Sequence, residues 1–139
     1  MKLEKKDKAQ DTLEVLKQNA LVNNEIIDKA NFSVLNRMIL ESTGDHDTFM
    51  VNNRYYNAYY HLKKSDALEG DSKYAMDIFS KDISYAYKIC SDFYYDQEYE
   101  LNDVMSAFHD YLFERYEGCI DEKVLNSIIS MHAYNIWHG

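Results

Sequence analysis

The chain of 139 residues contains no proline, and this absence constrains its fold more than any other feature. Proline inside a helix removes a backbone hydrogen bond and clashes with the preceding turn, so a chain without proline can form long uninterrupted helices. The alternating pattern of a β-strand is absent outside a short, ambiguous stretch from residue 93 to residue 99. The sequence therefore predicts a fold made of helices.

Apolar residues recur at helical spacing through most of the chain. The clearest stripe covers Leu101–Arg115, and Gly118 follows it at the position of a left-handed helix C-cap. A second stripe covers Leu125–Trp137, and Asp121 precedes it at the position of an N-cap. We therefore expect two C-terminal helices. The second is expected to bury its apolar stripe, including Trp137, and to continue to the end of the chain.

Three further segments are predicted to be helical, which brings the expected total to five or six helices. In the N-terminal forty residues, Asn23 interrupts the apolar stripe. We favour two helices or a bent one there, with Asn24 capping the second, over one long helix with a polar seam position. The other segments run from about Phe49 to Leu68 and onward from Ser72. We expect a single compact, bundle-like all-α domain over residues 1–139.

Negative charge is concentrated in one part of the chain. The formal net charge at pH 7 is -9, and residues 66–122 contain 4 basic and 15 acidic residues, whereas residues 1–65 contain 10 and 9. Because so acidic a chain is repelled by phosphate groups, direct binding to nucleic acid is not expected. An acidic surface is suited to a basic protein partner instead.

What the sequence lacks argues against several kinds of site. No segment approaches the roughly 18 apolar residues of a membrane span, and the N-terminal residues form no apolar signal segment, so a cytoplasmic protein without membrane contact is expected.

Cys90 and Cys119 match no paired-thiol motif, so both are expected to be reduced. Asp45, His46 and Asp47 have ligand-type side chains, but three neighbours along a chain do not converge easily on one ion. We therefore expect no metal and no cofactor.

Arg54 and His61 form a candidate catalytic pair. Their spacing places them on one face of a helix, about 10 Å apart along its axis, which is close enough to share a phosphate. The motif Arg-Tyr-Tyr-Asn-Ala-Tyr-Tyr-His resembles that of the HEPN family of helical nucleases and toxin partners. The resemblance implies that Arg54 binds phosphate and that His61 assists attack by a ribose hydroxyl without a metal. We favour the alternative, in which both side chains lie on the solvent side of an aromatic helix and the chain is not an enzyme.

Tyrosine is abundant in the acidic segment. Of the 13 tyrosines, eight lie between residues 66 and 122: Tyr74, Tyr85, Tyr87, Tyr94, Tyr95, Tyr99, Tyr111 and Tyr116. Only part of this set can face a core, and tyrosine is enriched at protein interfaces because it offers a large contact area with a polar tip. Aromatic and charged residues are densest in the turn that follows Phe93. We predict that the partner-binding residues are Tyr94, Tyr95, Asp96, Glu98, Tyr99 and Glu100.

In composition, the chain resembles the small, acidic, proline-poor proteins with which phages and mobile elements block CRISPR or restriction systems. This resemblance implies a protein-binding inhibitor or regulator, of the anti-CRISPR or nucleic-acid-mimic kind, that occupies a basic nucleic-acid-handling partner. The alternatives are a HEPN-like ribonuclease or toxin–antitoxin component acting through Arg54 and His61, and a homodimer that pairs its aromatic surface. A solvated acidic face that only maintains solubility is the simplest interpretation.

Overall fold

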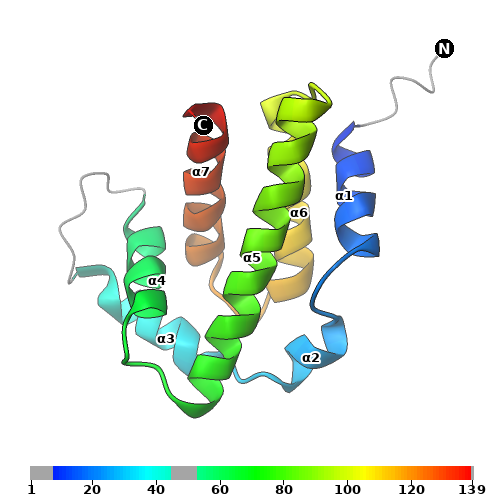
Figure 1. The fold of residues 1–139 in the computed structure, drawn as a ribbon. Helices are drawn as coiled ribbons and strands as arrows, with labels where there is room; N and C mark the ends of the chain where they lie inside the picture. The colour runs from blue at the N-terminus through cyan, green and yellow to red at the C-terminus, as the bar shows by residue number, and fades with distance from the viewer. Residues whose placement is uncertain (1–7, 45–52, 139) are drawn as a thin grey trace.

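The structure, a computed structural model, describes residues 8–44 and 53–138 and is all-helical over these ranges (Figure 1). In chain order, the elements are α1 (Lys8–Gln18), α2 (Asn24–Lys29), α3 (Ser33–Glu41), the 3₁₀ helix η2 (Ser42–Gly44), α4 (Arg54–Lys64), α5 (Gly70–Asp96), α6 (Leu101–Tyr116) and α7 (Glu122–His138). The all-α prediction is confirmed for these residues. The predicted count of five or six helices is wrong, because the described residues form seven α-helices.

The extra helix arises from two breaks in the N-terminal segment. The first break falls where it was predicted, but Asn23 is the cap of α2, because its side chain accepts a hydrogen bond of 2.9 Å from the backbone N–H of Ile26. The second break follows Ala30, whose backbone is extended, and the side chain of Asn31 accepts a hydrogen bond of 3.1 Å from the backbone N–H of Ser33. The Asn23 side chain therefore caps α2, whereas α3 follows a local turn at Asn31 and has Phe32 as its cap residue, so the segment contains three helices.

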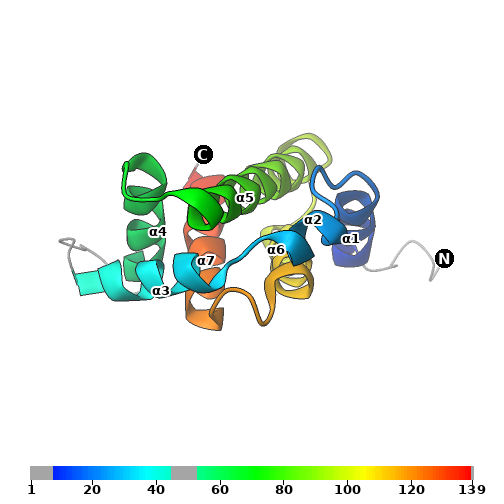
Figure 2. The ribbon, with the colours of Figure 1, turned by 90° about the horizontal axis from the view of Figure 1, so that it is seen from below.

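Helices α1, α4, α5, α6 and α7 run roughly along one direction, and the short helices α2 and α3 lie across one end (Figure 1). Helix α6 packs against α1, α5 and α7, and α4 packs against α7. Figure 2 shows α2 and α3 crossing the lower end of this arrangement. Buried apolar side chains from all seven α-helices form one hydrophobic core. The opposite end, where α5 turns into α6 and α7 ends, is not covered by the short helices.

The two C-terminal helices agree with the sequence prediction except at Trp137. Gly118 has φ of 84° just after α6, and the Asp121 side chain accepts a hydrogen bond of 2.9 Å from the N–H of Lys123 at the start of α7. Trp137, however, is 64% exposed, while Ile136 beside it is fully buried. Successive helical residues point about 100° apart, so the inward position of Ile136 turns the indole toward solvent.

Helix α5 is the longest element, with 27 residues. It begins two residues before the predicted start at Ser72, whose hydroxyl donates to the carbonyl oxygen of Glu69 at 2.8 Å and accepts from its N–H at 3.3 Å. Helix α4 begins at Arg54, and Phe49, the predicted start, lies outside the described residues. Among the described helices, none combines the length and the apolar composition that crossing a membrane demands.

Candidate partner-binding surface

The turn between α5 and α6 carries the predicted contact residues and reverses the chain sharply. The backbone N–H groups of Gln97 and Tyr99 both donate to the carbonyl oxygen of Phe93, at 3.3 and 3.1 Å. Glu98 lies between them with φ of 56°, in the left-handed region that residues other than glycine rarely adopt. This conformation folds Tyr99 back, so that its ring packs edge-on against Phe93 with centroids 5.1 Å apart. The turn is therefore held by its own backbone and rings.

Five of the six predicted contact residues surround one open hollow of about 690 Å³. This aromatic hollow is lined by Tyr94, Tyr95, Glu98, Tyr99, Glu100, Leu101 and Trp137. Asp96, the sixth predicted residue, is exposed on the same turn. Sequence reasoning missed Leu101 and Trp137 as members of this surface. Their place in it depends on α7 ending beside the end of α5, which no local pattern in the sequence reports (Figure 1).

The aromatic side chains of the hollow are exposed but held in place. Tyr95 is 51% exposed and Trp137 is 64% exposed, whereas Tyr94 and Tyr99 are half-buried. The Tyr95 hydroxyl donates to the carbonyl oxygen of Ile136, which links α5 to the last turn of α7. The rings of Tyr94 and Tyr95 meet edge-on with centroids 4.9 Å apart. These contacts restrict the rings, so a partner that binds them loses little side-chain entropy.

The surroundings of the hollow are negatively charged. Residues 93–103 include four carboxylates and no lysine or arginine: Asp96, Glu98, Glu100 and Asp103. Burial, followed by the negative charges of Asp11 and Asp103, raises the pKa of Tyr99. The ammonium group of Lys8 lies 4.9 Å from the centroid of the Tyr99 ring. An aromatic face of this surface is therefore already in contact with a cation.

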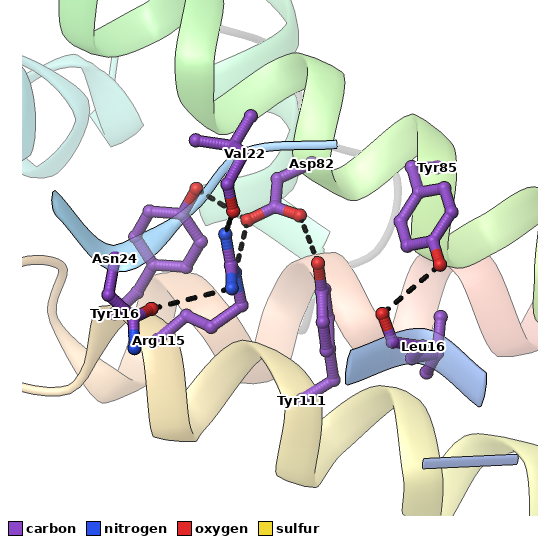
Figure 3. Close-up of polar contacts among 8 residues, drawn as sticks. All are labelled: Leu16, Val22, Asn24, Asp82, Tyr85, Tyr111, Arg115 and Tyr116. Carbon is purple, nitrogen blue, oxygen red and sulfur yellow. Dashed lines mark hydrogen bonds and ion pairs between the residues drawn. The ribbon is translucent and has the colours of Figure 1, made fainter. Parts of the chain in front are cut away.

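The other tyrosines of the acidic segment divide between core and surface. Tyr111 and Tyr116 are almost completely buried, and Tyr85 and Tyr87 are half-buried. The Tyr85 hydroxyl donates to the carbonyl oxygen of Leu16 at 3.1 Å, which ties α5 to α1 (Figure 3). Tyr74, which is 47% exposed, lies near the N-terminal end of α5, far along that helix from the aromatic hollow.

A second cluster of carboxylate and tyrosine residues lies inside the molecule, around the fully buried Asp82 (Figure 3). Its Oδ1 accepts from the hydroxyl of Tyr111 at 2.5 Å. Its Oδ2 accepts from the hydroxyl of Tyr116 at 2.8 Å and from Nε of Arg115 at 2.6 Å. Burial, followed by the Asp82 carboxylate, raises the pKa of both tyrosines, so both hydroxyls remain protonated donors.

The Asp82 cluster has a structural role, because its hydrogen-bonding groups are occupied. Arg115 also donates to the carbonyl oxygen of Val22 and to Oδ1 of Asn24, the latter at 3.5 Å, and so joins α5 and α6 to the α1–α2 connection. A neighbouring cavity of about 390 Å³ is lined by Arg115, Tyr111, Lys17, Asn24 and Glu114. Sequence reasoning missed this cluster, although Asp82 lies on the apolar stripe of α5, where a charged residue indicates a buried pair.

Arg54 and His61 are both exposed on α4. The guanidinium of Arg54 donates to the hydroxyl of Tyr55 at 3.2 Å and lies 5.0 Å from the centroid of that ring. The His61 ring packs edge-on against Tyr60, with centroids 6.2 Å apart.

The segment that contains Asp45, His46 and Asp47 precedes α4 and lies outside the described residues. Within the described ranges, no group of three ligand-type residues is arranged to hold a metal ion.

His132 on α7 packs among aromatic rings rather than facing a ligand site. Its ring centroid is 4.9 Å from that of Tyr87, 5.5 Å from that of Phe108 and 5.9 Å from that of Tyr56. Its Nδ1 lies 2.7 Å from the carbonyl oxygen of Ile128, so this nitrogen carries the proton and donates. Burial lowers the pKa of His132 more than the hydrogen bond to Ile128 raises it, and the charge of Lys63 lowers it further. The neutral form is therefore the one that fits the fold.

The two cysteines are unpaired thiols. Cys90 is fully buried, donates to the carbonyl oxygen of Val104 at 3.4 Å, and has its pKa raised by burial to about 12. Because the thiolate is the reactive form, Cys90 is unsuited to nucleophilic chemistry.

Comparison with protein-family models, with curated proteins and with solved structures finds no match to this chain. A functional assignment therefore depends on the surface chemistry of the chain itself. Between the Asp82 cluster and the aromatic hollow, the aromatic hollow is the one whose rings and carboxylates are exposed to a partner.

Proposed function

We propose that this chain is a protein-binding inhibitor or regulator that occupies the basic surface of a nucleic-acid-handling protein. In this proposal it acts in the cytoplasm as a single compact, bundle-like domain, phage- or mobile-element-encoded and of the anti-CRISPR or nucleic-acid-mimic kind. The observation that carries the proposal is the aromatic hollow, in which predicted contact residues from α5 and the following turn meet Trp137 of α7.

The exposed rings supply the contact area that binding needs. Tryptophan and tyrosine dominate the binding energy of protein interfaces, because they bury large apolar surfaces while losing few rotatable bonds. Tyr95 and Trp137 are each more than half exposed, so a partner that covers them removes apolar surface from water. Tyr94 and Tyr99, which line the same hollow, are half-buried.

The carboxylates supply the selectivity for a basic partner. Glu98 and Glu100 line the hollow beside the rings, Asp96 lies on the same turn, and all three are exposed. Complementary charge speeds diffusional encounter and disfavours acidic partners. Nucleic acid presents anionic groups beside flat aromatic bases, and this surface presents the same two features. A basic groove that binds phosphates and stacks bases is therefore a suitable target.

The test is site-specific photocrosslinking in the native host cell. A photoreactive phenylalanine is placed at Tyr95, and a matched control carries it at Tyr74, an exposed tyrosine at the other end of the same helix. The expected result is crosslinking from position 95, but not from position 74, to a basic nucleic-acid-binding protein. Crosslinks that are equal at both positions, or that reach only acidic proteins, contradict the proposal.

A second step tests inhibition with the purified partner. The wild-type chain is expected to displace nucleic acid from that partner, and added salt is expected to weaken the displacement because the attraction is electrostatic. Reversing the charge at Asp96, Glu98 and Glu100 to lysine is expected to abolish it. Displacement that is indifferent to both changes removes the basis of the proposal.

A second candidate function is that of a HEPN-like ribonuclease or toxin–antitoxin component. The exposure of both Arg54 and His61 on α4 favours it, because an RNA phosphate can reach both side chains. On this proposal the purified chain cleaves RNA without added metal, and His61→Ala abolishes the cleavage while Tyr74→Phe does not. An inactive parent chain eliminates this candidate.

A further inference from the structure

We propose that the aromatic hollow is a binding site for an arginine side chain of the partner, and that it prefers arginine to lysine. This inference rests on the proposed function, because it names the basic group that the surface accepts. A guanidinium is planar, stacks on aromatic faces and forms paired hydrogen bonds with a carboxylate. A site for it therefore needs exposed rings with carboxylates beside them.

The hollow provides both components within one lining. The rings come from Tyr94 and Tyr95 on α5, from Tyr99 in the turn, and from Trp137 on α7. Tryptophan is the ring that binds cations most strongly, and this one is 64% exposed. Glu98 and Glu100 belong to the same lining and are themselves exposed.

The molecule already contains an arginine bound in this manner. In the Asp82 cluster, the guanidinium of Arg115 lies 5.0 Å from the centroid of the Tyr111 ring, while its Nε donates to Asp82 at 2.6 Å (Figure 3). A tyrosine face and a carboxylate together hold this guanidinium between α5 and α6. The aromatic hollow has the same two groups and is open to solvent.

Lysine is expected to bind the hollow less well than arginine. Its ammonium group is compact and strongly hydrated, and it lacks the flat face and the fork of donors that a guanidinium offers. The ammonium of Lys8 already lies over the ring of Tyr99, so this ring face is occupied for either side chain and the other rings of the hollow have to supply the preference. The remaining rings favour a group that stacks.

Trp137 makes the proposal directly testable, because it is the only tryptophan in the chain. The full chain is titrated with a peptide of three arginines separated by glycines, and with the same peptide carrying lysines, while the tryptophan fluorescence is followed. The arginine peptide is expected to shift the emission and to bind about tenfold more tightly than the lysine peptide. Circular dichroism confirms that each variant is folded.

Two variants and a control locate the preference. Trp137→Leu, followed by calorimetry because the fluorescence is lost, is expected to make the two peptides bind alike. Glu98→Gln with Glu100→Gln is expected to weaken both peptides, and Tyr74→Leu is expected to change neither. If the two peptides bind the wild-type chain equally, or if the preference for arginine survives in Trp137→Leu, the proposal of an arginine site is wrong, while the proposal of a basic partner remains supported. If neither peptide binds even at low salt, the arginine site and the proposed function both fail.

Discussion

The Asp82 cluster and the aromatic hollow are built from the same kinds of residue and serve opposite purposes. In the cluster, the carboxylate receives hydrogen bonds from two tyrosines and an arginine, and it is fully buried. In the hollow, Glu98 and Glu100 are exposed, and neither has an ion-pair partner among the described residues. A carboxylate whose partners belong to the same chain stabilises the fold, whereas one that faces solvent is available to another molecule.

The same contrast applies to the tyrosine hydroxyls. Those of Tyr111 and Tyr116 point at one buried carboxylate from two positions on α6. The hydroxyl of Tyr95 bonds to a backbone carbonyl of α7, and this leaves the face of its ring exposed. Substitutions in the two regions should therefore separate stability from binding.

The largest expected effect follows from removing the charge at the centre of the cluster. Asp82→Asn leaves the Arg115 guanidinium without its counter-charge in a buried site, which is expected to lower the free energy of unfolding by about 3–5 kcal/mol. Urea denaturation measures this loss of stability. Asp77→Asn is the matched control on the same helix, because its exposed pair with Lys73 contributes about 0.5 kcal/mol or less. Similar losses in the two variants would mean that burial does not distinguish these carboxylates.

Next in size is the loss of one tyrosine hydroxyl from the cluster. Tyr111→Phe and Tyr116→Phe each remove a donor to a buried carboxylate, and each is expected to lower the free energy of unfolding by about 1.5–3 kcal/mol. Tyr74→Phe, at an exposed position, should stay within about 0.5 kcal/mol of the wild type. The prediction fails if all three substitutions have the same effect in urea denaturation.

A smaller effect concerns the pH dependence of stability and the half-buried side chain of His132. The pKa of His132 is lowered from 6.5 in the folded chain, so the unfolded chain takes up the proton first as the pH falls. The stabilisation is present above about pH 6.5 and is lost as the pH decreases below it. The groups facing this ring are Tyr56, Tyr87, Phe108 and Lys63. His132→Phe should show a weaker pH dependence from pH 7 to 5 in urea denaturation, and an unchanged slope contradicts this assignment.

The smallest expected effect has the opposite sign and belongs to the hollow. Glu98 adopts a left-handed backbone that costs a residue with a side chain about 1–2 kcal/mol. Glu98→Gly relieves this cost, but the flexible unfolded glycine offsets about 0.5–1 kcal/mol of the gain. The free energy of unfolding should therefore increase by up to about 1.5 kcal/mol in thermal or urea unfolding, while the affinity for a basic partner decreases. A variant that is less stable than the wild type would show that the turn is not strained at this position.

Local patterns in the sequence predicted the regular elements of the fold well. The helix over Leu101–Tyr116 follows directly from apolar residues three and four positions apart, and Gly118 ends it as expected. The break at Asn23 was predicted, but the cap was assigned to Asn24, one residue too late. The break after Ala30 was missed, because no proline or glycine marks it.

Part of the candidate surface was also predictable. Residues 94–100 are crowded with rings and carboxylates in a segment that a helix cannot bury on all sides, and five of the six residues chosen there line one hollow. Trp137 was assigned to the core because it is the last residue of an apolar stripe. Its spacing along the sequence is the same whether its side chain faces the core or faces solvent beside the buried face of the helix. The burial of Ile136 decides this, and it depends on α4, α5 and α6 packing around α7.

The sequence by itself determined that this chain is helical, where most of its helices lie, and that its aromatic and negative groups are too many to be buried together. These properties depend on residues close together along the chain. The tertiary structure alone decided which tyrosines became internal donors and which remained exposed. Asp82 and Arg115 are 33 residues apart, and Tyr95 and Ile136 are 41 apart, so only the packing of distant helices brings each pair together.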